Sequence, residues 1–543
     1  MITHTIVAVI AAFTVCLFVS PIPEVPTEAY VLPYVIANGL LSWFFSRGSS
    51  FTTSFTSLIT INAAFILTST LTTIIRRLYF SPLSRYPGPK LAAVSGLWNA
   101  NEARLGRTPR THKALHERFD SDVVRIGPNE LSIRNVGAID QFYGGKYIRG
   151  NFSQVFNLQG GQNVASLRDH KIHGAWRRIW GRAFAGSEIL RYTQRLHVHT
   201  SRTVEKLRRL SGKPVECGHL LDALAFDIIL DLAFSQDYGL QKGKGDFKPV
   251  ELIHNFLGLM QVVGHLPHAQ QVLRYLPMDP DGVLFDQIGE GIFAKRQTLK
   301  TPREDIFEHL GKPDRETGIK MSNKDIKMHI PITMTVGAHS ISTTLTRTFA
   351  ALASQPDIQA RIRQELGDTL GENEVMSSKT LRGARYLEAV VKEGLRMFSP
   401  LHGGTPAISP KGGITLDTGD FIPEHTQIWI GQHVMMSDEK YFPRAGEFLP
   451  QRWLIQEGSK EGDMTNLVKD KRAWIPFGYG THACGGRALA MEEMKVTVAR
   501  IVRDFDISFR QPQFDYDSWA DSWKDLFLTV IEKIDLRFVP RTV

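Results

Sequence analysis

One cysteine near the C-terminus stands in surroundings that stabilise a thiolate. Residues 474–495 read WIPFGYGTHACGGRALAMEEMK, so Cys484 lies in a glycine-rich loop that becomes a run of strong helix formers from Arg487 onward. The dipole and free N–H groups of a helix N-terminus favour a thiolate. Glycines let the backbone approach something large and flat, Phe477 can keep water from the sulfur, and His482 can reach an anionic group. A buried structural cysteine is the alternative for such a residue taken alone.

The same run resembles the haem-binding loop of the cytochrome P450 family, F-x-x-G-x-R-x-C-x-G, at Phe477, Gly480, Cys484 and Gly486. His482 stands where that family more often has Arg, which keeps a hydrogen-bond donor but makes its charge depend on pH. The resemblance implies that Cys484 is the thiolate ligand of the iron in haem b. Electron donation from the thiolate favours O–O cleavage.

A second motif, E-x-x-R, lies upstream at Glu393 and Arg396, whose spacing puts both side chains on one helix face. The segment 448–453 follows it and contains Arg452. In the family, an Arg at this place completes a buried triad with the Glu and Arg, so we expect a structural lock behind the haem. Two other pairs match E-x-x-R and are interpreted as solvated helix faces, Glu188–Arg191 and Glu205–Arg208.

A basic, aromatic-rich stretch at residues 173–184 resembles the family's C-helix. His173 and Arg177, one helical turn apart, then fall where that family holds the haem propionates, and Arg suits bidentate carboxylate recognition. An ordinary solvated helix is the alternative. We also expect four basic residues to face an acidic electron-donating partner, namely Arg178, Arg182, Lys471 and Arg487.

The middle of the chain holds one candidate for the oxygen-activating helix, residues 330–352. Aligned with the family pattern A/G-G-x-D/E-T-T/S, Gly337 is kept, the acid becomes His339 and the Thr becomes Ser340. We expect Gly337 to leave room beside the iron, and Ser340 and His339 to deliver protons. Protons supplied by solvent are the alternative. A further departure is Ala407, near which family members often carry an Arg that binds a propionate.

Three apolar stretches precede residue 80, at roughly 6–19, 30–45 and 58–75. Because a spanning helix needs about 20 residues, only the third is long enough by itself. Arg76 and Arg77 follow it, and the positive-inside rule puts the rest of the chain in the cytosol. We therefore predict a membrane anchor over residues 1–79, with one to three spans, and a cytosolic haem-thiolate domain over 80–543. A cleaved signal peptide is the alternative for the first stretch.

The composition sets the fold class. The chain has 543 residues, 43% of them hydrophobic, no linker after the anchor and only three cysteines, which excludes a disulfide framework. Its net charge of +9 is dispersed rather than gathered in runs, so we expect no nucleic-acid partner. The resemblance implies a single-domain cytochrome P450 fold, mainly α with small β-sheets. The loosely alternating residues 422–434 are a candidate strand.

The resemblance also implies the reaction. One oxygen atom from O2 would enter a small hydrophobic substrate, with electrons from NADPH through NADPH-cytochrome P450 reductase. The chain looks most like fungal members, many of which modify terpenoids or other secondary metabolites, and we expect it in the endoplasmic reticulum membrane. Residues 99–165 and 250–300 are expected to shape the pocket. Two alternatives stay open: a reductase-independent isomerase or dehydratase, and a non-catalytic membrane haem protein.

Overall fold

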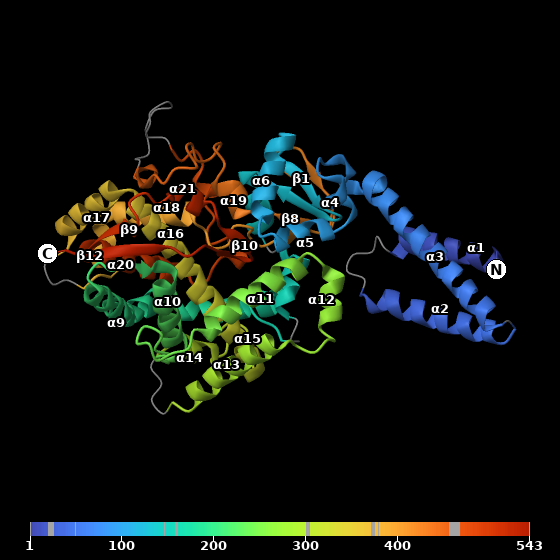
Figure 1. Ribbon diagram of the computed structural model, residues 1–543, viewed down its shortest axis with the longest axis horizontal. Coiled ribbons are helices and arrows are strands. Elements are labelled where there is room, and N and C mark those ends of the chain that lie inside the picture. Colours follow the sequence, from blue (N-terminus) through green and yellow to red (C-terminus); the bar gives the residue numbers. More distant parts are fainter. Residues whose placement is uncertain are drawn as a thin grey trace.

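The computed structural model describes residues 2–19, 26–48, 50–145, 147–157, 161–299, 304–370, 375–377, 379–454 and 467–541. These residues form a largely helical body with small sheets, and the N-terminal helices project from one end of it (Figure 1). The fold class predicted from the sequence, mainly α with small β-sheets in one domain, is confirmed.

The described residues contain the following α-helices: α1 (Ile2–Thr14), α2 (Glu28–Ser46), α3 (Phe51–Ile75), α4 (Lys90–Val94), α5 (Leu97–Arg104), α6 (Thr108–Phe119), α7 (Val136–Tyr143), α8 (His170–Ala183), α9 (Gly186–Leu210), α10 (Cys217–Phe234), α11 (Lys248–Gly264), α12 (Pro267–Leu273), α13 (Pro280–Gln297), α14 (Ile306–Leu310), α15 (Asn323–Met334), α16 (Ser340–Ser354), α17 (Pro356–Thr369), α18 (Arg385–Met397), α19 (Gln432–Met436), α20 (Arg487–Asp504) and α21 (Tyr516–Ala520). The strands are β1 (Val123–Gly127), β2 (Glu130–Ile133), β3 (Ile148–Arg149), β4 (Val215–Glu216), β5 (Ala407–Ile408), β6 (Ile414–Thr415), β7 (Phe421–Ile422), β8 (Gln427–Trp429), β9 (Phe505–Phe509), β10 (Lys524–Leu526), β11 (Leu528–Val530) and β12 (Asp535–Pro540).

One long helix organises the body. It consists of α15, the π-helical turn η5 (Thr335–His339) and α16, and it packs against α10, α18 and α20 (Figure 1). A capping box at Ser322 and Asp325 starts it by satisfying free N–H groups at its N-terminus. Almost every side chain of α16 is buried, so this helix is the centre of the hydrophobic core.

The largest sheet has the strand order β1-β2-β8-β5-β3, with β2 and β8 parallel and the other pairs antiparallel. The prediction of one strand over residues 422–434 is wrong. The segment divides into the end of β7, then β8, then the start of α19. Pro423 and the left-handed backbone of His425 (φ 59°) interrupt the extended run, since Pro lacks the N–H that a ladder needs.

The N-terminal helices lie side by side outside the body. Two are long and apolar enough to cross a membrane by length and composition, Glu28–Ser46 and Phe51–Phe80, and the apolar helix His4–Phe18 is shorter. Polar contacts join them across their faces: Asn62 on α3 donates to Asn38 on α2 over 2.7 Å. The Sγ atom of Cys16 lies 3.5 Å from Oγ1 of Thr73 on α3.

Two attachments connect these helices to the body. Arg125 on β1 donates to the carbonyl of Arg77 over 2.8 Å and through its N–H to that of Pro87 over 2.7 Å. A Cβ on Gly88 would lie 2.1 Å from the Arg125 carbonyl oxygen, so glycine is required there. At the other attachment, the N–H of Thr27 donates to Gln271 on α12 over 2.6 Å.

Candidate functional site

A cavity of about 410 Å³ lies between the central helix and the loop that carries Cys484. Its wall combines residues from this loop, from α8, from η5 and α16, and from the strand region around Ile430. The sequence therefore brings together, around one space, the three segments that were singled out for chemistry.

The Cys484 loop is built from backbone contacts that require its glycines. The N–H of Cys484 donates to the carbonyl of Phe477 over 2.7 Å, which closes the loop. Gly480 has φ +66°, and a Cβ there would lie 1.6 Å from the Tyr143 carbonyl oxygen. Phe477 and Cys484 both line the cavity, and α20 begins at Arg487, three residues after the cysteine. The predicted setting of a cysteine just before a helix N-terminus is thus present.

Cys484 is exposed to the cavity, and its surroundings act on the ionisation of its thiol in opposite directions. Burial raises the pKa of its thiol, and the backbone N–H groups of Gly486 and Arg487 and the positive charge of Arg177 oppose that rise. A coordinating metal ion removes the proton of a thiol outright. The surroundings supply hydrogen bonds and positive charge for the anionic form, and they leave its full stabilisation to a metal.

One edge of the cavity gathers positive and imidazole side chains. His173 and Arg177 lie on α8, as predicted, and the ring centroids of His173 and His482 are 4.0 Å apart. Arg149 on β3 joins them: its Nε donates to Nδ1 of His482 over 3.1 Å. Sequence reasoning missed Arg149, which also lines the cavity and is buried. Burial, Arg149 and Arg177 together lower the pKa of His173 to about 4, so this ring is neutral at neutral pH.

This edge fits the carboxylates of a haem. Arg149 and Arg177 take part in no ion pair among the described residues, and Nε2 of His173 is buried without a hydrogen-bond partner. Buried charges and donors are costly unless something pairs with them. A Cβ on Gly485 would lie 3.0 Å from Nη1 of Arg177, so the loop comes close to this guanidinium. A flat ligand with two carboxylates and a thiolate-binding iron matches this set of donors.

On the opposite wall, the central helix presents Ser340 and Gly337 to the cavity. The Ser340 hydroxyl donates to the carbonyl of Val336 over 2.6 Å, a back-bond that bends helices. A Cβ on Gly337 would lie 2.5 Å from the side chain of Ile229, so glycine at this position allows α10 to pack closely. Gly337 also lines the cavity. The π-helical turn ends just before Ser340, and such turns are frequent at functional sites.

His339 points elsewhere and is not among the described residues that line the cavity. Its Nε2 lies 3.0 Å from the carbonyl oxygen of Thr529 on β11, and its Nδ1 lies 3.1 Å from Nε2 of His254 on α11. Burial lowers the pKa of each ring to about 4, so both are neutral at neutral pH. The carbonyl requires a proton on Nε2 of His339, and His254 then donates to Nδ1. His339 thus connects the π-helical turn η5 to α11 and β11.

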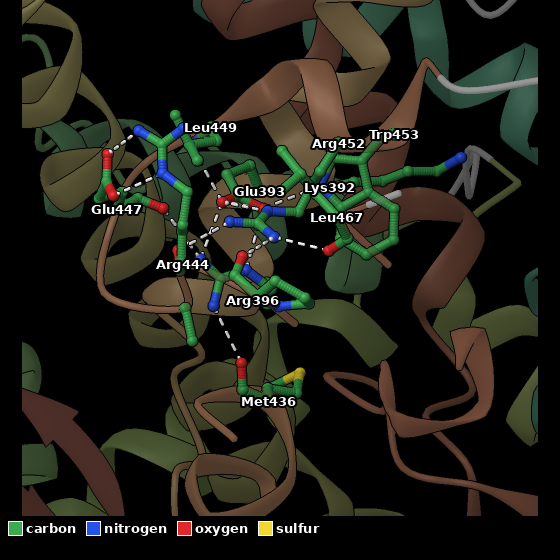
Figure 2. A network of polar contacts seen from close by, with 12 residues as sticks. Lys392, Glu393, Arg396, Met436, Arg444, Glu447, Leu449, Arg452, Trp453 and Leu467 are labelled. Atoms are coloured by element: carbon green, nitrogen blue, oxygen red, sulfur yellow. Dashed lines mark hydrogen bonds and ion pairs between the residues drawn. The ribbon is translucent and has the colours of Figure 1, made fainter. Parts of the chain in front are cut away.

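Figure 2 shows the predicted triad of Glu393, Arg396 and Arg452 assembled in one network of polar contacts. The Glu393 carboxylate accepts from Nη2 of Arg396 over 2.8 Å and from Nε of Arg452 over 2.9 Å. It also accepts from the indole of Trp453 over 2.9 Å, and the remaining guanidinium protons reach backbone carbonyls such as those of Met436 and Leu467. All three charged side chains are at most 3% exposed.

The other E-x-x-R pairs are not buried on both sides, although Glu188, expected on a solvated helix face, is only 8% exposed. Glu188 and Arg191 form an ion pair of 3.3 Å, and the Arg191 side chain is 55% exposed. Glu205 pairs with Arg209 rather than Arg208, over 3.4 Å, and both side chains are exposed. Burial of both charged side chains, which the sequence pattern does not contain, therefore distinguishes the Glu393–Arg396 pair from the other two.

Two of the four basic residues expected to meet a redox partner are engaged within the chain. Arg178 forms a forked pair with Asp314, at 3.0 and 2.8 Å, and Arg182 donates to the Pro313 carbonyl over 2.8 Å. Lys471 and Arg487 are exposed and take part in no ion pair within the ranges that the structure describes. The surface available to an acidic partner is therefore smaller than the sequence predicted.

The rest of the cavity wall is mainly apolar, with a few polar side chains such as Asn163, Gln432 and Glu493. The two segments expected to shape the pocket contribute Phe156 from the first, and Phe256 and Phe285 from the second. Phe527 and Leu528, from the region of β10 and β11, also line the cavity, and no local sequence signal marks them. The lining suits a hydrophobic molecule.

Comparisons with known proteins agree with this site. The cytochrome P450 family model matches residues 131–536. Cytochrome P450 67 of Uromyces fabae is 28% identical over 86% of this chain and 88% of its own length. Cytochrome P450 monooxygenase sthD of Phaeosphaeria nodorum is 27% identical over 86% of this chain and 97% of its own length. Cytochrome P450 monooxygenase phqL of Penicillium fellutanum is 27% identical over 89% and 84%.

The buried triad generates a stability prediction. Glu393→Gln leaves Arg396 and Arg452 buried without their counter-charge, and breaking such a pair costs about 3–5 kcal/mol. Because a domain has about 5–15 kcal/mol in total, we expect a large drop in the thermal midpoint of the solubilised protein and little bound haem. Glu205→Gln breaks an exposed pair and is the control, expected to cost about 1 kcal/mol or less. Equal melting of the two variants would show that the triad is not a lock.

Proposed function

The chain belongs to the cytochrome P450 family, and from that premise we propose that it inserts one oxygen atom from O2 into a small apolar secondary metabolite, with electrons from NADPH through a partner reductase. It is an oxidoreductase of the monooxygenase class. The observation that carries the proposal is the cavity that Cys484 and Ser340 share, closed at one edge by Arg149 and Arg177.

Haem b, when bound, supplies the oxygen-activating iron, and the residues of this chain supply its setting. Cys484 provides the thiolate ligand, and Phe477 shields that ligand from water. Arg177, His173 and His482 bind the carboxylate edge. Ser340 holds a proton at its Oγ and must turn away from the Val336 carbonyl to donate into the cavity. His339 holds the bend that presents Ser340, through Thr529 and His254.

The substrate class is inferred from the lining and from the relatives. Three phenylalanines from different segments, Phe156, Phe256 and Phe285, give the space above Ser340 an apolar wall. Several relatives are named cytochrome P450 monooxygenases and come from fungi such as Phaeosphaeria nodorum and Penicillium fellutanum. A terpenoid or a similar hydrophobic skeleton is the substrate class that this wall favours.

We propose that the N-terminal helices form a three-span anchor in the endoplasmic reticulum membrane, with the body in the cytosol. His4, near the start of α1, lies against Phe45 at the end of α2, with ring centroids 5.4 Å apart. Cys16, just after α1, contacts Thr73 near the end of α3. The three helices therefore alternate in direction, and the N-terminus lies far from the body (Figure 1). Hydrogen bonds such as Asn62 to Asn38 are the kind that join helices in lipid.

Cys484 generates the first functional prediction. Reduced protein with CO should show the strongly red-shifted Soret band of thiolate ligation, and Cys484→Ala should abolish it because the sulfur ligand is lost. With a reductase and a host supplying candidate scaffolds, product should form only with NADPH. A band that survives in Cys484→Ala would refute the ligand assignment, and turnover without NADPH would favour an isomerase or dehydratase.

The second functional prediction concerns Ser340 and His339. Because Ser340 faces the cavity, Ser340→Ala should raise hydrogen peroxide and lower product per NADPH by up to about 100-fold, the lower end of what a general acid catalyst contributes. His339→Gln should leave this ratio close to that of the parent and lower the thermal midpoint. Ser354→Ala, at the far end of α16, is the control. Strong uncoupling by His339→Gln would instead place His339 on the proton path.

The anchor generates the third. Glycosylation acceptor sites placed before residue 2 and within residues 47–50 should both be modified in microsomes, because both ends lie away from the body. A site within 20–27 should stay unmodified. Modification at 47–50 without modification at the N-terminus would mean that α1 does not span, which contradicts a three-span anchor.

A further inference from the structure

Arg149 occupies an unusual place for a guanidinium. It lies on the two-residue strand β3 at the edge of the largest sheet, is only 8% exposed, and faces the cavity. Its Nε donates to Nδ1 of His482 over 3.1 Å, and no carboxylate among the described residues pairs with it. Its ionisable neighbours include Arg177, His173, Tyr143 and Tyr147, and burial raises the pKa values of both tyrosines. Among the described residues, this buried guanidinium thus has no counter-charge.

The bond from Arg149 also positions the His482 ring, whose centroid lies 4.0 Å from that of His173. Arg149 and Arg177 are the two guanidiniums at this edge of the cavity, and haem b carries two carboxylates.

The register of the sheet explains why the guanidinium fits. Arg149 pairs directly with Ala407 on β5, and directly paired residues of antiparallel strands project to the same face about 5 Å apart. Ala407 is 0% exposed and has a single methyl group, which leaves the space for the Arg149 side chain. A long side chain at both positions would not fit.

We infer that Arg149 is a haem-carboxylate ligand and the residue that orients the His482 ring, with Ala407 as the small partner that makes room for it. The inference deepens the proposed function and rests on it through the presence of haem. Arg177 binds one carboxylate from α8, and Arg149 binds the other from β3 and through His482.

The test measures haem retention in the holoenzyme. Removing a charge-assisted hydrogen bond should speed haem transfer from the ferric protein to apomyoglobin about 10- to 100-fold in Arg149→Gln. Arg149→Lys, which keeps the charge without the fork, should fall between that variant and the parent. Arg134→Gln, which breaks a partly exposed ion pair with Asp122, is the control and should transfer haem at the parental rate.

Two further measurements separate ligation from mere packing. The carboxylate bending bands in the resonance Raman spectrum should shift in Arg149→Gln and stay unchanged in Arg134→Gln. The double variant Arg149→Ala with Ala407→Arg returns a guanidinium from the paired position and should retain haem better than Arg149→Ala alone. Parental haem loss in Arg149→Gln, unshifted bands, or a double variant no better than Arg149→Ala would each overturn the inference. Absence of the thiolate–CO band in the parent would instead defeat the proposed function.

Discussion

The site depends on charges that the protein buries and leaves to a ligand. Arg149 and Arg177 stand at one edge of the cavity without a carboxylate in the described part of the chain. Other buried charges have partners within the chain: Glu393 receives two guanidiniums and an indole, and Arg296 meets Asp305 at 2.7 Å. Arg125 and Arg347, which are buried without an ion pair, donate to backbone carbonyls. Because an unpaired buried charge is strongly destabilising, a ligand with two carboxylates would supply the counter-charges that this edge of the cavity lacks.

On the central helix formed by α15, η5 and α16, two adjacent residues make different polar contacts. The π-helical turn η5 interrupts the regular α-helical hydrogen bonds just before Ser340, which lines the cavity. The preceding residue, His339, uses both ring nitrogens in hydrogen bonds to β11 and α11. Ser340 thus faces the cavity, and His339, just before it, connects the helix to α11 and β11. A helix rotates about 100° per residue, so adjacent positions must have different neighbours. This explains how two residues that share one motif come to have different surroundings.

The sequence predicts best where chemistry requires fixed spacing. The Cys484 loop, the helix carrying His173 and Arg177, and Ser340 on the cavity wall all lie as expected, because each belongs to a continuous motif on one element. The E-x-x-R pattern needed burial to distinguish Glu393 from Glu205. Arg149 escaped prediction because β3 has only two residues, and its register with Ala407 is a tertiary fact. The direction of His339 was equally hidden, since its partners are more than 80 residues away.

The anchor and the cavity share structural elements. Thr27, at the start of α2, bonds to Gln271 on α12, and α12 connects α11 to α13. Those two helices supply Phe256 and Phe285 to the cavity wall, and α11 also carries His254, the partner of His339. At the second attachment, Arg125 fixes the end of α3 to β1, so the helices meet the body at two separate places. Two fixed points restrict rotation of the N-terminal helices against the body far more than one. Through Gln271, one of these points lies between the two helices, α11 and α13, that supply side chains to the cavity wall.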